Sequence, residues 1–154
     1  MYYAFSYENE YNNKVMQKVI EKTGLPIYTI DGKSWAVNRL DQYGIKLWKQ
    51  SGPKAFLELL NSAKLVFVQS FHGIIFSALF HKKFWSLRNK IIKNLDDDRA
   101  RVILHQTGLE SRAITFEELL TRDLMEEVNY TTVDENIEKM RARAFEYISE
   151  FMKE

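Results

Sequence analysis

The 154-residue sequence contains no cysteine and carries almost no net charge. Without cysteine the chain forms no disulfide, uses no thiolate nucleophile and binds no zinc or iron–sulfur cluster through sulfur. Lys and Arg number 22 against 21 Asp and Glu, which gives a formal net charge of +1. A protein that binds nucleic acid through bulk positive charge is therefore not expected, and we predict no nucleic-acid partner.

The sequence also lacks a long uninterrupted apolar run. Its most apolar window, residues 65–80, is broken by Gln69, Ser70 and His72. A membrane-spanning helix needs roughly 20 consecutive apolar residues, so this window does not qualify. The first ten residues have neither the basic region nor the apolar stretch of a signal peptide. From the sequence we expect a cytoplasmic protein.

Apolar and aromatic residues, in contrast, are plentiful. They include 10 Phe, 8 Tyr and 3 Trp, and the apolar fraction is 45%. This supply suffices for a packed core and excludes wholesale disorder. The length favours one domain, and no repeat, linker or low-complexity tract divides the chain. We therefore predict a single domain over residues 1–154.

Apolar periodicity and turn signals predict that strands alternate with helices. The predicted strands cover residues 2–5, 27–30, 65–69 and 84–87. The predicted helices cover residues 8–22, 54–62, 74–80 and 134–152, with a further helix from about Asp96 to Gly108 and a short one capped by Thr115 and Glu118. Residues 34–50 are expected to form a loop that holds at most a short helix. This order predicts an α/β fold with a Rossmann-like parallel sheet and helices on both faces.

Ligands in such folds bind beyond the carboxyl ends of the strands. One of these ends, after Gln69, carries the most informative residues of the chain. Ser70 can cap the following helix, and the free N–H groups at a helix start favour an anion. Gly73 allows a ligand to approach the backbone, and His72 can donate a proton there. The alternative is a common strand–turn–helix connection in which the histidine has no chemical role.

A longer pattern surrounds this turn. It comprises Gly52, Pro53, Phe56, Leu57, Ser-Phe-His-Gly at residues 70–73, Phe76, Ser77, Lys83, Phe84, Arg99, Gly108, Leu109 and Arg112. In this order and spacing the residues resemble the signature region of the polysaccharide pyruvyl transferase family. The likeness extends over nearly the whole chain. One difference is Gln69, because family members usually carry an acidic residue immediately before the serine.

The resemblance implies the C-terminal Rossmann-like domain of a two-domain transferase of the GT-B type. The missing N-terminal domain would then be a partner, together with phosphoenolpyruvate as donor and a saccharide acceptor. The implied reaction transfers a pyruvyl unit, as a ketal, to a bacterial surface polysaccharide or cell-wall glycan. The resemblance implies no cofactor and no metal, and it is compatible with peripheral contact with membrane-linked acceptors and with an oligomer.

Site residues follow from the turn and from the resemblance together. His72 is predicted either to contact the pyruvyl carboxylate or to act as the general acid. Ser70, Phe71 and Gly73 are predicted to form the loop that holds the donor's anionic groups. An arginine fork suits phosphate and carboxylate alike, and Arg88 is placed for this role at the end of a predicted strand.

Arg99 is a second candidate for contact with the donor, although an ion pair with Asp96 on the helix surface would also explain it. The acidic run of residues 96–98 is interpreted as helix N-terminal charge rather than as a metal site.

Two other functions stay open at this point. The same fold can serve as the nucleotide-sugar-binding half of a GT-B-type glycosyltransferase. Alternatively, the domain is a non-catalytic binding or assembly module, which the neutral Gln69 would allow.

Overall fold

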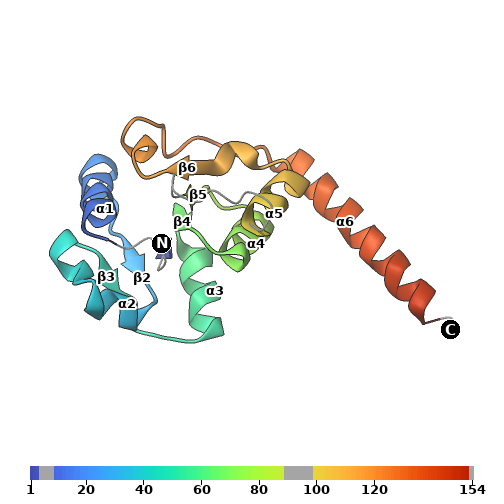
Figure 1. The fold of residues 1–154 in the computed structure, drawn as a ribbon, viewed down its shortest axis with the longest axis horizontal. Helices are drawn as coiled ribbons and strands as arrows, with labels where there is room; N and C mark the ends of the chain where they lie inside the picture. Colours follow the sequence, from blue (N-terminus) through green and yellow to red (C-terminus); the bar gives the residue numbers. More distant parts are fainter. Residues whose placement is uncertain (4–8, 89–98, 153–154) are drawn as a thin grey trace.

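The computed structural model describes residues 1–3, 9–88 and 99–152 and shows strands interleaved with helices (Figure 1). The strands are β1 (Tyr2–Tyr3), β2 (Tyr28–Thr29), β3 (Lys46–Leu47), β4 (Val66–Val68), β5 (Phe84–Arg88) and β6 (Ala113–Thr115). The α-helices are α1 (Glu10–Thr23), α2 (Gly32–Val37), α3 (Pro53–Ser62), α4 (Phe71–Leu79), α5 (Arg99–Thr107) and α6 (Tyr130–Phe151). Short 3₁₀ turns are η1 (Leu40–Tyr43), η2 (Glu110–Arg112) and η3 (Glu118–Leu120).

The strands are parallel and have the order of a Rossmann fold. Strands β1, β4, β5 and β6 form one hydrogen-bonded sheet in that order, and β2 pairs with β3. Because β2 also contacts β1, the strands lie in the order β3-β2-β1-β4-β5-β6. This is the order of the dinucleotide-binding fold, and the predicted Rossmann-like α/β class is confirmed.

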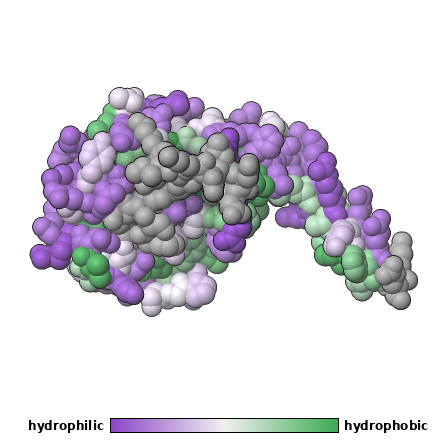
Figure 2. All heavy atoms as spheres, viewed as in Figure 1, coloured by the Kyte–Doolittle hydropathy of each residue, from purple (hydrophilic) through white to green (hydrophobic). Residues whose placement is uncertain are grey.

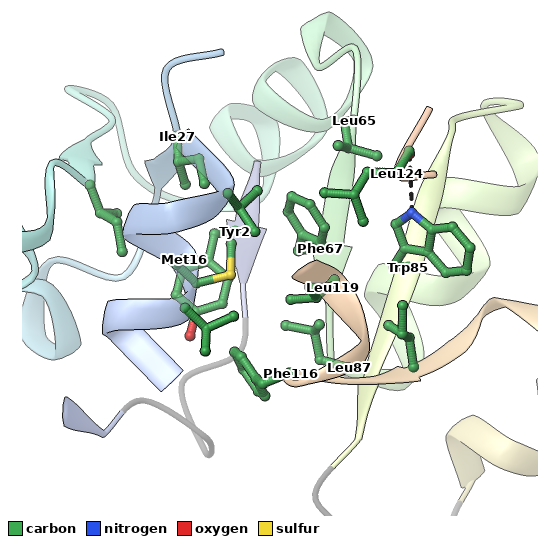
Figure 3. Close-up of a cluster of buried hydrophobic side chains, with 14 of the residues drawn as sticks. Tyr2, Met16, Ile27, Leu65, Phe67, Trp85, Leu87, Phe116, Leu119 and Leu124 are labelled. Carbon is green, nitrogen blue, oxygen red and sulfur yellow. Dashed lines mark hydrogen bonds between the residues drawn. The ribbon is translucent and has the colours of Figure 1, made fainter. Parts of the chain in front are cut away.

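Buried side chains form a core on each face of the sheet. On one face Phe67, Trp85 and Leu87 pack against α1 and η3, as Figure 3 shows. On the other face Val66 and Phe84 pack against α3, α4, α5 and the start of α6. Successive residues of a strand point to opposite faces, so the continuous apolar run of β4 supplies both cores. Helices thus cover both faces, as the sequence predicted.

Two strands and two helix starts differ from the predictions. Strand β3 consists of two exposed residues, and β6 has three residues of which only Ile114 is buried, so neither gives an apolar run that a sequence pattern can detect. Helix α4 begins at Phe71 rather than at residue 74, because Ser70 caps it. Helix α6 begins at Tyr130 rather than at residue 134, with Asn129 as its cap. The proposed helix-terminal charge of residues 96–98 lies outside the described residues.

Helix α6 is the longest helix of the described residues and extends away from the body of the domain (Figure 1). Its first half packs against α5, and its second half is exposed. None of the helices in the described ranges combines the length and the apolar content needed to cross a membrane.

Candidate functional site

The candidate site lies where the strand order reverses, between β1 and β4. Chain connections from these two strands run to opposite sides of the sheet, and in folds of this type ligands bind beyond the carboxyl ends of the strands at such a reversal. Tyr3 ends β1, Gln69 and Ser70 follow β4, and Arg88 ends β5. The predicted residues Ser70 and Arg88 therefore share one edge of the sheet.

Ser70 fixes the start of α4. Its backbone is extended (φ −74°, ψ 147°) and its Oγ accepts a hydrogen bond from the Gly73 N–H at 3.1 Å. The carbonyl of Ser70 accepts the N–H of Ile74 at 3.1 Å. No described residue accepts the N–H groups of Phe71 and His72, the remaining donors of this first turn. Two adjacent free donors at the positive end of a helix form an anion-binding arrangement.

The structure shows a packing role for the glycine at position 73 that the sequence did not predict. A Cβ at this position would lie 2.8 Å from Val68 Cγ1 and 3.0 Å from Ser70 Oγ. The missing side chain therefore lets α4 pack closely on β4. Its N–H is also occupied by the Ser70 cap. Gly73 contributes to the site by positioning the helix that carries Phe71 and His72.

His72 is exposed in the first turn of α4, next to Phe71. The two rings meet edge to face, with centroids 5.6 Å apart. The guanidinium carbon of Arg99 lies 5.9 Å from the centre of the Phe71 ring, at the outer limit of a cation–π contact. The structure thus brings Arg99 to the Ser70–Gly73 turn from the start of α5. Its alternative partner, Asp96, lies outside the described residues.

Arg88 stands one strand away from the turn. In the register of β4 and β5, Val68 pairs with Ser86, so Arg88 is level with Ser70. Side chains alternate along a strand, so Arg88 emerges on the same face as Val68, which α4 covers. The half-buried Arg88 side chain therefore leaves the sheet on the side of the helix start.

Gln69 occupies the position at which the resemblance predicts an acid. Its side chain is half-buried, and its Oε1 is buried with no hydrogen-bond donor among the described residues. A buried carbonyl oxygen without a donor is destabilising, which fits a group that a ligand would complete.

Tyr3 and Asp31 are further groups at this edge that the sequence patterns did not single out. Burial, and secondarily the nearby Asp31 carboxylate, raise the pKa of the Tyr3 phenol. Their only sequence signal is that each lies at or just after the end of a strand. Within the parts of the chain that the structure describes, no group of three His, Asp or Glu side chains could hold a metal ion.

The family model for polysaccharide pyruvyl transferase matches residues 3–91, which is more than half of the chain. The chain belongs to the polysaccharide pyruvyl transferase family. The matched region starts within β1 and contains the Ser70–Gly73 turn and Arg88, whereas Arg99 lies beyond it. Comparisons with curated proteins and with solved structures find no match.

Other residues of the sequence pattern pack away from the Ser70–Gly73 turn. Phe56 lies between Tyr3 (ring centroids 5.5 Å apart) and Phe76 (6.1 Å), so these signature aromatics hold α3 and α4 beside β1. Arg112 is buried 4.8 Å above the Trp85 ring and donates to the Glu127 carbonyl at 2.7 Å. In this chain of the pyruvyl transferase family, Arg112 is therefore a packing residue remote from the Ser70–Gly73 turn.

Proposed function

We propose that this domain binds phosphoenolpyruvate and acts in the transfer of its pyruvyl unit to a saccharide. The observation that carries the proposal is the pair of free N–H groups of Phe71 and His72 at the start of α4. They lie at the strand-order reversal, in a chain of this transferase family. Phosphoenolpyruvate carries a phosphate and a carboxylate. One group can lie on the helix start while the Arg88 guanidinium holds the other.

The proposed reaction transfers the pyruvyl unit of phosphoenolpyruvate to two hydroxyls of one sugar. A general acid protonates the methylene carbon of phosphoenolpyruvate, and one sugar hydroxyl attacks the adjacent carbon after losing its proton to a base. The carbon–oxygen bond to phosphate then breaks, a second hydroxyl of the same sugar adds to the same carbon, and the proton of that hydroxyl leaves with the phosphate. The products are a pyruvate ketal and inorganic phosphate. The acceptor is proposed to be a surface polysaccharide or cell-wall glycan.

His72 has one of two roles in this scheme. As the general acid, it donates the proton to the methylene carbon. As a binding group, it contacts the pyruvyl carboxylate beside the amides of the first turn. Arg99, whose guanidinium carbon lies 5.9 Å from the centre of the Phe71 ring, supplies a second cation close to the same turn.

A second candidate function keeps the fold and changes the donor. The strand order β3-β2-β1-β4-β5-β6 is that of nucleotide-binding domains, which favours the nucleotide-sugar half of a glycosyltransferase. The neutral Gln69 leaves a third option, a binding module without catalysis.

Calorimetric titration separates these functions. We expect phosphoenolpyruvate to bind more tightly than phosphate or pyruvate alone, and UDP-glucose not to bind. The Arg88→Gln variant should lose about 10- to 100-fold in affinity for phosphoenolpyruvate, since charged hydrogen bonds contribute roughly 1.5–3 kcal/mol. Arg101→Gln, at an exposed position of α5, is the matched control and should bind as the wild type does. Binding of UDP-glucose alone would support the glycosyltransferase half, and binding of neither ligand would support the non-catalytic module.

A further inference from the structure

The second half of α6 is an exposed helix with an apolar face. Every residue from 141 to 152 is exposed, and this part of the helix projects from the body of the domain (Figure 1). Its apolar side chains are large: Phe145, Tyr147, Ile148, Phe151 and Met152. Figure 2 shows apolar residues gathered along the projecting helix. A contiguous apolar face of this kind marks an interaction surface.

The exposed apolar face of α6 is the continuation of a row of residues whose first part is buried in the domain. Steps of three and four residues along α6 give one seam: Tyr130, Val133, Ile137, Met140, Ala144, Tyr147 and Phe151. The first four pack against the second core, whereas the last three extend past the edge of the domain. A seam with this spacing is the one through which two helices pair in a coiled coil.

An apolar pocket lies where the seam leaves the domain. Its volume is about 290 Å³, and its lining includes Ile75 and Leu79 of α4, Ile103 of α5, and Ile137 and Met140 of α6. The pocket is therefore continuous with the exposed half of the seam. It can bind an apolar side chain of a second helix that packs along the seam.

The charges beside the seam indicate what covers it. Lys139, Arg143, Glu146 and Glu150 follow one another at steps of four, three and four residues, so they share one flank of α6. The flank is basic in its first half and acidic in its second half. Two antiparallel copies bring this flank of one helix against the same flank of the other, so the basic half of each lies opposite the acidic half of its partner. In a parallel pair the two flanks would not meet, and this complementarity would be lost.

We propose that a second copy of this chain covers the seam, with the two α6 helices antiparallel about a twofold axis. In an antiparallel pair, Ala144 faces Tyr147 of the second copy, so a small side chain meets a large one. Phe151 faces Met140 of the second copy and enters the apolar pocket there. Arg143 and Glu150 of the two copies meet twice across the symmetric interface.

Sedimentation velocity of the full chain over a concentration series tests the proposal. The wild-type chain should form a dimer. Arg143→Glu and Glu150→Arg should each weaken dimerisation by about tenfold, because each variant creates two like-charge contacts. The double variant Arg143→Glu/Glu150→Arg should dimerise as the wild type does. Arg122→Glu makes the same charge change at an exposed position away from α6 and should have no effect.

Three results would overturn the proposal. If the chain is monomeric at all concentrations, a second copy does not cover the seam. If such a monomer binds vesicles of phosphatidylcholine and phosphatidylglycerol through α6, the face belongs to a membrane surface instead. If the wild type dimerises but neither single charge reversal weakens the dimer, the antiparallel seam is excluded. It is also excluded if the double variant does not dimerise as the wild type does. Phe151→Ser should also weaken the dimer, and an unchanged dimer would exclude insertion into the pocket.

Discussion

His72→Ala is expected to slow pyruvyl transfer by about 10²–10⁴-fold, the usual contribution of a positioned general acid. The imidazole is exposed beside the two free amides of the α4 start, where a bound donor would meet it. If His72 is the acid, kcat falls and the affinity for phosphoenolpyruvate is retained. If it holds the carboxylate, KM for phosphoenolpyruvate rises instead. Phosphate release with p-nitrophenyl hexosides as acceptors, together with detection of the ketal methyl group by NMR, measures both quantities.

The matched control for this variant is His105→Ala. His105 is also exposed, but it lies on α5 and pairs with Glu110 at 2.6 Å. Its replacement should leave kcat and KM unchanged. A His72→Ala variant that keeps both constants within twofold of the wild type would remove His72 from the mechanism.

Gly73→Ala is expected to lower the free energy of unfolding by roughly 1–3 kcal/mol, the usual cost of overpacking a tight contact. The new Cβ would lie 2.8 Å from Val68 Cγ1 and 2.9 Å from Val68 Cβ, so α4 must shift away from β4. Because the shift displaces the Phe71 and His72 amides, binding of phosphoenolpyruvate should weaken as well. Urea unfolding and calorimetry measure the two effects.

Two companion variants show whether the contact with Val68 is the cause. Gly32→Ala adds a Cβ whose nearest neighbour, Leu47 Cδ2, is 3.8 Å away, so it should leave stability nearly unchanged. Val68→Ala removes the Cγ1 contact but keeps the Cβ at 2.9 Å, so in the Gly73→Ala background it should restore only part of the ligand binding. Wild-type stability of Gly73→Ala would contradict the close packing of α4 on β4.

The sequence alone was sufficient for the fold class, and it placed Ser70 at the carboxyl end of a strand, where the structure has it. The apolar run of residues 65–69 predicted β4, and the helix after Ser70 was predicted to start within three residues of its position in the structure. Both signals are local, because they depend on hydrophobic patterning and on a side-chain–backbone hydrogen bond. The alternation of strands and helices predicted a parallel Rossmann-like sheet, but the strand order comes from the structure, which adds β3 and β6.

Contacts that depend on how helices and strands pack could not be predicted in this way. Glycine is needed at position 73 because Val68 leaves no room for a Cβ, and only the packing of α4 on β4 shows this. The approach of Arg99 to Phe71 depends on how α5 docks beside α4. The resemblance included Arg112, but only the structure places it over Trp85, remote from the site.

Backbone NMR of the isotope-labelled chain during titration with phosphoenolpyruvate tests the central claim most directly. We predict that the amide signals of Phe71 and His72 move most, because their N–H groups are the free donors of the α4 start. The Arg88 side-chain signal should move with them. An intact spectrum in which these signals stay fixed, or in which the shifts gather at the apolar pocket between α4, α5 and α6, would contradict the assignment of this edge as the donor site.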